Sequence, residues 1–148
     1  MKPLHFGTAL LFLLIITLSA TAQNHGAERQ PIFKNSADRL PTAITELDKA
    51  FNLKEGTSVS FKFYNMAFSG TVVSAADKHG RIKSVVIESS SLKNTILSLS
   101  KITNDDKTIT YTGRILNQGA SDGYELTKNQ DGTYTFHKIR TDDLIQDY

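Results

Sequence analysis

Beyond the N-terminal segment, the side chains best suited to metal binding or acid–base catalysis are those of His25, His79 and His137. Metal-binding histidines usually occur in short motifs such as His-Glu-x-x-His, and none of the three belongs to one. His79 stands in Asp77-Lys78-His79-Gly80, a sequence typical of a solvent-exposed turn. The sequence therefore predicts no metal site.

The serines and acidic clusters do not form catalytic or cofactor motifs either. Ser89–Ser91, Ser98 and Ser100 lie outside any Gly-x-Ser-x-Gly sequence, and no Gly-x-Gly-x-x-Gly or P-loop sequence is present. The clusters at residues 104–106 and 129–132 lack the Asp-x-Asp-x-Asp-Gly spacing and terminal Glu of a calcium loop, so they predict turns. We therefore expect a protein that is not an enzyme and that binds no cofactor.

The composition excludes further classes. The chain has 148 residues, with 17 Lys and Arg against 15 Asp and Glu. This near balance offers no basic footprint for nucleic acid. The absence of cysteine excludes disulfides, Cys-ligated zinc and thiol catalysis. A chain of this size can bury a core without such cross-links.

The N-terminal 22 residues have the three parts of a secretory signal peptide. Lys2 supplies the positive charge, residues 9–16 are apolar, and the small residues Ala20 and Ala22 precede Gln23. A transmembrane helix would need about 20 consecutive apolar residues, and this run is shorter. The pattern predicts cleavage after Ala22 and a secreted or periplasmic protein with no membrane span in its mature part.

One amphipathic helix is predicted within residues 36–53. Leu40, Ile44, Leu47 and Phe51 follow one another at intervals of four, three and four residues, as on one face of a helix. Pro41 suits the first helical turn, where its missing N–H is not needed. We expect a helix of about three turns that covers one face or one end of the domain.

After Gly56 the apolar residues alternate, which predicts β-strands. Turn-forming clusters separate the runs, and short connections indicate antiparallel neighbours. We expect mainly β structure, with about seven short strands in a small barrel or a two-layer sandwich; the sequence leaves both open. The expected strands are residues 59–64, 68–74, 82–88, 95–101, 108–116, 124–128 and 133–139.

These patterns divide the chain into four parts. The signal peptide (1–22) precedes a polar, flexible leader (23–35), in which Ile32 and Phe33 are a docking point. A single β-rich domain with an N-terminal helix follows at residues 36–140. Residues 141–148 form an acidic tail that we expect to be mobile in the free protein, because ordering it costs more than its few apolar residues return.

Two glycine-containing strands share the pattern aromatic, hydroxyl, glycine, any residue and two aliphatics, at Phe68–Val73 and Tyr111–Leu116. Together with Ser84–Ile87 and Tyr124-x-Leu126, this series resembles the inhibitory prodomains of secreted reprolysin-like zinc metalloproteases over roughly residues 57–139. The resemblance implies a protease partner. The sequence departs from that family because it has no cysteine for a cysteine switch and no protease domain follows Tyr148.

An export signal combined with a regular β pattern favours an exported, non-enzymatic domain that binds another macromolecule, either prodomain-like or protease-inhibitory. The alternatives are a carrier of an apolar small ligand inside the barrel or sandwich, and a hydrolase with a dispersed site. Residues expected to contact a partner are Tyr64, on the outward alternation of its strand, and Asp142, Asp143 and Tyr148 of the tail.

Overall fold

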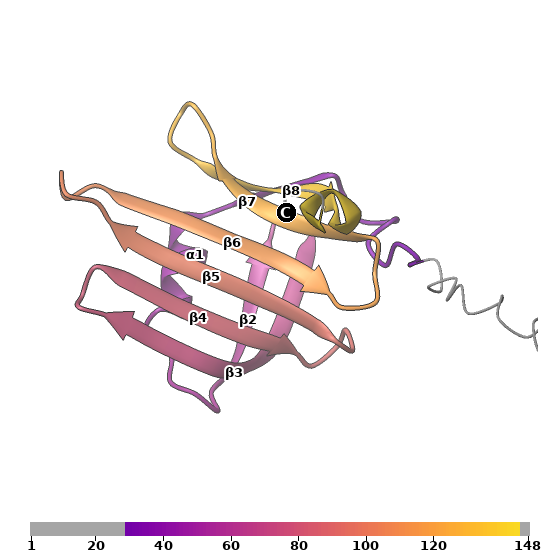
Figure 1. Cartoon of the computed structure of the whole chain (residues 1–148), viewed down its shortest axis with the longest axis horizontal. Coiled ribbons are helices and arrows are strands. Elements are labelled where there is room, and N and C mark those ends of the chain that lie inside the picture. The colour runs from indigo at the N-terminus through magenta and orange to yellow at the C-terminus, as the bar shows by residue number, and fades with distance from the viewer. Residues whose placement is uncertain (1–28, 146–148) are drawn as a thin grey trace, which may run out of the picture.

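The computed structural model describes residues 29–145, and in them eight antiparallel strands form a single sheet (Figure 1). The strand order is β1-β8-β7-β6-β5-β4-β3-β2, so every strand from β2 to β7 pairs with the next one in sequence. The strands are β1 (Arg39–Thr42), β2 (Ser58–Phe63), β3 (Met66–Lys78), β4 (Ile82–Ser89), β5 (Thr95–Thr103), β6 (Ile109–Asn117), β7 (Asp122–Lys128) and β8 (Tyr134–Arg140). Helix α1 (Ile44–Ala50) follows β1, and the 3₁₀ helix η1 (Thr141–Ile145) follows β8.

The mainly β, antiparallel architecture is confirmed, and each expected run corresponds to one of the strands β2 to β8. The expectation of a barrel or sandwich holds only in its coarser form, because the single sheet curls into a half-barrel. In Figure 1, β3 to β6 form the front of the sheet, whereas α1 and β2 lie behind them.

The expected three-turn helix is wrong in length, because its first part is strand β1. Arg39–Thr42 pairs with β8, and its Leu40 and Thr42 side chains are buried in alternation. Pro41 lies on this edge strand, where a missing N–H is tolerated on the free side. The helix itself covers only Ile44–Ala50 and buries Leu47 and Ala50, while Ile44 is exposed.

The curl of the sheet depends on a bend in β3. The register between β3 and β4 shifts between Val72 and Ser74, as in a β-bulge. Just before this bulge, a Cβ on Gly70 would lie 2.2 Å from the main-chain oxygen of Glu88. Only glycine therefore permits β4 to approach β3 at the bend.

Aromatic side chains fill the concave face. The rings of Phe61 and Phe63 stack at a centroid distance of 5.6 Å, and Phe63 meets Phe136 at 4.9 Å. Phe63 belongs to β2 and Phe136 to β8, strands that are not neighbours in the sheet. This contact therefore crosses the mouth of the half-barrel and holds its two margins together.

Helix α1 covers the remaining opening next to β2. Glu46 accepts a hydrogen bond from the main-chain N–H of Lys62, which lies on the free edge of β2. The edge strand is thus partly satisfied by a side chain of the helix rather than by another strand. In the described part of the chain, no helix has the length and apolar character needed to span a membrane.

Residues on both sides of the strand-forming region pack onto the sheet. Phe33, in the expected leader, is 2% exposed, and its ring meets that of Tyr124 at 5.1 Å. The buried carboxylate of Asp122 accepts the main-chain N–H groups of Ile32 and Phe33 at 2.8 and 2.9 Å. Of the expected docking point, Phe33 thus lies in the core, whereas Ile32 is 44% exposed. After β8, the Thr141 hydroxyl donates to the carbonyl of Ala120 at 2.7 Å, so the first residue of η1 is buried against the domain.

Candidate functional site

The residues first considered for chemistry lie apart from one another. His79 occupies an exposed hairpin turn with φ of 55°, and His137 lies on β8 opposite Glu125 and Arg39. Ser89 and Ser90 both donate to the carbonyl of Ser69, so they join two strands rather than act as nucleophiles. No group of three or more His, Asp and Glu side chains suited to a metal ion occurs within residues 29–145.

The two loops considered as calcium sites are turns with nearly identical structures. In the β5–β6 loop, Asn104 Nδ2 donates to the hydroxyls of Thr108 and Thr110, and Asp106 accepts from the N–H and hydroxyl of Thr108. Asn129, Asp131, Thr133 and Thr135 repeat every one of these bonds in the β7–β8 loop.

The Asp106 and Asp131 carboxylates are thus used to fix the turns. Hydrogen bonds from Thr108 and Thr133 lower the pKa of Asp106 and of Asp131, respectively. The sequence signal for this duplication is Asn-x-Asp-x-Thr-x-Thr, in which the threonines, and not only the turn-forming residues, are repeated.

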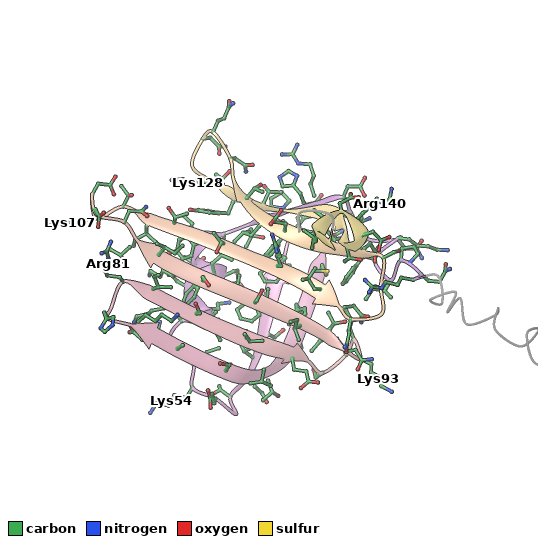
Figure 2. All side chains as sticks on the ribbon, in the orientation of Figure 1. Lys54, Arg81, Lys93, Lys107, Lys128 and Arg140 are labelled. Carbon is green, nitrogen blue, oxygen red and sulfur yellow. The ribbon has the colours of Figure 1, made fainter. Side chains whose placement is uncertain are left out.

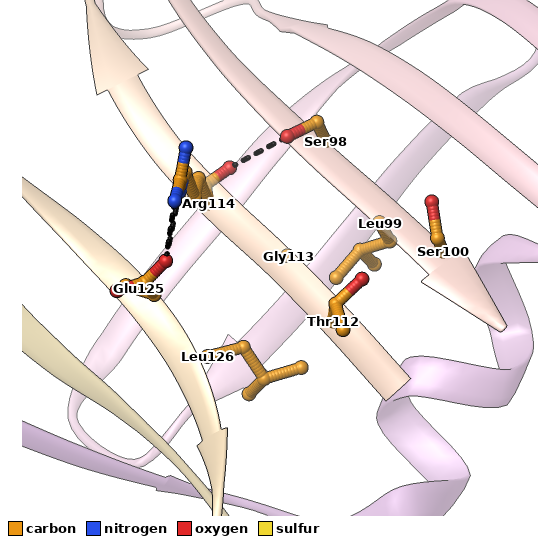
Figure 3. Close-up of a pocket in the computed structure, with 8 residues that line it drawn as sticks. All are labelled: Ser98, Leu99, Ser100, Thr112, Gly113, Arg114, Glu125 and Leu126. Atoms are coloured by element: carbon orange, nitrogen blue, oxygen red, sulfur yellow. Dashed lines mark hydrogen bonds and ion pairs between the residues drawn. The ribbon is translucent and has the colours of Figure 1, made fainter. Parts of the chain in front are cut away.

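The candidate site is a hollow of about 370 Å³ on the convex face, where β6 and β7 separate (Figure 3). The two strands pair from Gly113 to Leu116 of β6, and the pairing stops at Gly113 and Leu126. Toward the β5–β6 and β7–β8 loops, β6 and β7 diverge, and the β7–β8 hairpin rises away from the sheet (Figure 1). The hollow is lined by Ser98, Leu99, Ser100, Thr112, Gly113, Arg114, Glu125 and Leu126.

A tyrosine of β8 occupies the concave side of this opening. The Tyr134 hydroxyl accepts the main-chain N–H of Tyr111 at 3.2 Å, on the side of β6 where β7 would otherwise pair. The two rings meet edge to face at a centroid distance of 5.3 Å. Tyr134 thus satisfies one backbone donor of β6 while the two strands stay apart.

Tyr111 is held in turn by helix α1. Its hydroxyl donates to Asp48 Oδ1 at 2.8 Å, and Lys101 Nζ lies 2.8 Å from the same oxygen. Burial and the hydrogen bond to Asp48 raise the pKa of the Tyr111 hydroxyl, so it stays protonated near neutral pH. Burial opposes ionisation of Asp48, but the hydrogen bonds from Lys101 and Tyr111 outweigh it and lower the pKa of this carboxyl.

The rim of the hollow carries an ion pair and several hydroxyls. Arg114 donates from Nε and Nη2 to Oε1 of Glu125, at 2.9 and 2.7 Å. The Arg114 side chain is 45% exposed and that of Glu125 is 36% exposed, so both face solvent beside the hollow. The Thr112 hydroxyl has no hydrogen-bond partner among the residues of the structure described, and it lies between this pair and Ser100. The rim therefore offers both donors and acceptors.

The floor of the hollow is the main chain at Gly113, between Leu99 and Leu126 (Figure 3). A Cβ at this position would lie 2.5 Å from Leu99 Cδ2 and 2.7 Å from the carbonyl oxygen of Ser98. Leu99 therefore takes the space that a side chain at residue 113 would need. Gly113 is thus required for the close packing of β5 against β6 beneath the hollow.

The residues expected to contact a partner lie elsewhere. Tyr64, 60% exposed with φ of 55°, lies in the turn between β2 and β3, and Asp142 and Asp143 begin η1. No hydrogen bond or ion pair within the described range connects Tyr64 with either acid. Tyr148, together with Ala20, Ala22 and the predicted cleavage site, lies outside the described residues.

Apart from Arg114, which lines the hollow, exposed basic side chains are spread around the sheet. Figure 2 shows Arg81, Lys107 and Lys128 on hairpins at one end of the sheet and Lys93 and Arg140 toward the other. Arg81 is paired with Asp105 at 2.5 Å. Local charge at the hollow therefore comes from Arg114 and Glu125.

A second, more apolar groove of about 520 Å³ lies between the convex face and η1. Ile96, Leu116 and Leu144 provide its apolar lining, and Arg29 and Glu88 are its charged residues. By contrast, the interior in which a carrier would hold an apolar ligand is filled: Phe61, Phe63, Leu97, Leu99 and Ile115 are at most 2% exposed and belong to one packed core.

Comparison of the chain with protein-family models, with curated proteins and with solved structures found no match in any of the three.

Proposed function

We propose that this chain is an exported, non-enzymatic β-domain that binds another protein through the hollow between β6 and β7. The observation that carries the proposal is the opening in an otherwise continuous sheet, with hydroxyls and an ion pair exposed at its rim. Interfaces combine such polar groups with a desolvated floor, which Leu99 and Leu126 supply here.

Export to the periplasm or the medium is part of this proposal, and it is supported by the sequence of residues 1–22. The resemblance over residues 57–139 supports a protease as the partner, in which case the domain is inhibitory. A strand edge suits such a partner, because main-chain hydrogen bonds to an extended segment do not depend on the partner's side chains.

The test is to fill the hollow. Thr112→Trp places a large side chain among Ser100, Arg114 and Glu125, at an exposed position without a hydrogen bond to lose. Ser74→Trp is the matched control, because Ser74 is an exposed residue of β3, outside the hollow. The mature wild-type and variant chains are immobilised, and the proteins each retains from the producing cell's exported fraction are quantified by mass spectrometry.

We expect at least one protein that the wild type and Ser74→Trp retain equally and that Thr112→Trp retains about tenfold less, a difference of about 1.4 kcal/mol. Circular dichroism melts establish that both variants fold. Equal retention by all three chains, or retention of nothing above background, would refute the proposal.

A second candidate is carriage of an apolar small ligand, and one observation favours it: the apolar groove beside η1 is as large as common ligand pockets. It differs from the interior carrier considered above, because the core positions are filled. Binding of a fluorescent apolar dye that Leu116→Asp abolishes would support it. Dye binding unaffected by that substitution would remove it.

A further inference from the structure

We infer that the partner presents an extended polypeptide segment, which adds a strand to the free side of β6 in the opening left by β7. This inference rests on the proposed function and specifies what enters the hollow. Three features support it: the main-chain groups that the opening leaves unpaired, the alternation of side chains between the two faces of β6, and the chemistry of those two faces.

The backbone of β6 has two sides, and only one is fully paired. Along its length β6 pairs with β5, from Ile109 opposite Thr103 to Asn117 opposite Thr95. The main-chain N–H of Asn104 donates to the carbonyl of Thr108. Because hydrogen-bonded pairs alternate along an antiparallel ladder, the even-numbered residues of β6 direct their main-chain N–H and carbonyl groups toward β5. The odd-numbered residues Ile109 and Tyr111 therefore direct their main-chain groups toward the opening.

These groups form the pattern that an added antiparallel strand needs. No strand in the described part of the chain pairs with β6 on this side between residues 109 and 112. Tyr134 takes the N–H of Tyr111, which leaves the N–H and carbonyl of Ile109 and the carbonyl of Tyr111. Residues in an antiparallel pair exchange one N–H and one carbonyl bond, so Ile109 offers one complete pair and Tyr111 half of another.

The side chains beside the opening determine which peptide residues face which way. Residues directly opposite each other in an antiparallel pair have their side chains on the same face. Partners of Ile109 and Tyr111 therefore point to the concave side, where Tyr111, Leu126 and Tyr134 are at most 5% exposed. Their sequence neighbours point to the convex side, toward Thr112 and the Arg114–Glu125 pair. The segment recognised should alternate apolar and polar residues.

Because alternate residues of the added strand would bond to β6, a synthetic peptide can test the inference. The probe is a capped, fluorescent heptapeptide, Lys-Thr-Val-Thr-Val-Thr-Lys, and its binding to the mature chain is followed by fluorescence anisotropy. If its valines face the concave side, the N–H groups of the valines bond to β6 and those of the threonines point away. N-methylation of the valines should therefore weaken binding at least about tenfold, whereas N-methylation of the threonines should change it by less than about twofold.

Changes in the protein provide independent readouts. Ile109→Pro removes the free N–H and should weaken peptide binding like valine methylation, whereas Ile109→Ala keeps that donor and should bind nearly as the wild type does. Tyr134→Phe releases the N–H of Tyr111, which becomes available to the peptide. This variant should bind the probe about fivefold more tightly, as expected for one additional hydrogen bond.

The results separate this inference from the proposed function. No binding of the probe up to about 1 mM, or equal weakening by the two methylations, would overturn the strand-addition inference. If Thr112→Trp still loses the captured partner in that case, the hollow binds a folded surface and the proposed function stands. If Thr112→Trp retains the partner fully, the proposed function fails whatever the peptides show.

Discussion

Replacement of Asp122 by alanine should release the segment before β1 from the sheet. The Asp122 side chain is buried and accepts two main-chain N–H groups, from Ile32 and Phe33. Hydrogen bonds to a charged group contribute about 1.5 to 3 kcal/mol each. Once the segment detaches, however, its N–H groups bond to water. The total cost is therefore limited to the free energy that holds the segment in place.

Burial of Phe33 sets that limit. Full burial of a phenylalanine side chain contributes about 1.5 to 3 kcal/mol, and its edge-to-face contact with Tyr124 adds about 0.5 to 1.5 kcal/mol. We therefore expect Asp122→Ala to lower the free energy of unfolding by about 3 kcal/mol, and Phe33→Ala by a similar amount. Because either change releases the same segment, the double variant should lose about 3 to 4 kcal/mol rather than the sum.

The assay is urea denaturation of the mature chain followed by circular dichroism, since the protein contains no tryptophan. Asp143→Ala is the control, because it removes an exposed carboxylate from η1 and should change stability by less than about 0.5 kcal/mol. Additive losses in the double variant, within about 0.5 kcal/mol, would show that the carboxylate and the ring act independently. Cooperative docking of this segment would then be refuted.

Three further predictions concern α1, the bend and the loops. Because the pKa of Asp48 is lowered in the folded protein, its ion pair with Lys101 stabilises the fold at pH values above the ordinary pKa near 3.8, and this contribution is lost as the pH falls through the lower pKa of the folded state. Wild type should therefore be more stable than Asp48→Asn by at most about 1 kcal/mol for this partly exposed pair. In urea titrations, this difference should disappear below the pKa of the folded state. Gly70→Ala should cost more than about 3 kcal/mol in the same assay, whereas Gly119→Ala, whose nearest neighbour would be 3.6 Å away, should cost less than about 1 kcal/mol. Lys107 has φ of 66° at the position where the β7–β8 loop has Gly132, so Lys107→Gly should relieve about 1 kcal/mol of backbone strain and raise the melting temperature. An unchanged or lower melting temperature would contradict that reasoning.

Most of the sheet follows from alternation, and the exception shows why. Strands β2 to β8 each carry at least two apolar residues in alternation, such as Tyr134 and Phe136 of β8, and this spacing indicates a strand. Strand β1 has four residues, and its inward Leu40 also fits the helical spacing to Ile44 and Leu47. Its strand conformation comes from pairing with β8, a contact far away in sequence. Local periodicity therefore favoured the longer helix.

The candidate site could not be predicted in the same way. A glycine within a strand commonly marks a place where another group packs against the backbone, and at Gly113 that group is Leu99. The separation of β6 from β7, however, depends on the Tyr134 hydroxyl reaching the main chain of Tyr111, which sequence spacing does not reveal. Tyr64, Asp142 and Asp143 were chosen for exposure or charge alone, and neither property indicates where a sheet opens.

The position of the opening follows from the duplicated hairpins. Strands β5 and β6 pair from Thr95 to Thr103, and β7 pairs with β8 along the whole of Asp122–Lys128. Each hairpin is closed by the same Asn-Asp-Thr hydrogen-bond set, so neither can open at its loop without losing several bonds.

The junction between the hairpins has no such closure, and β6 and β7 pair only over Gly113–Leu116. The sheet is therefore open at this junction and not within either hairpin. A segment that enters there needs to break no pair within either hairpin, and the bond between Tyr111 and Tyr134 can stay in place while Ile109 and the Tyr111 carbonyl pair with it. A rigid scaffold with one unpaired stretch of backbone is the arrangement that strand addition requires, since the ordering cost falls on the incoming peptide alone.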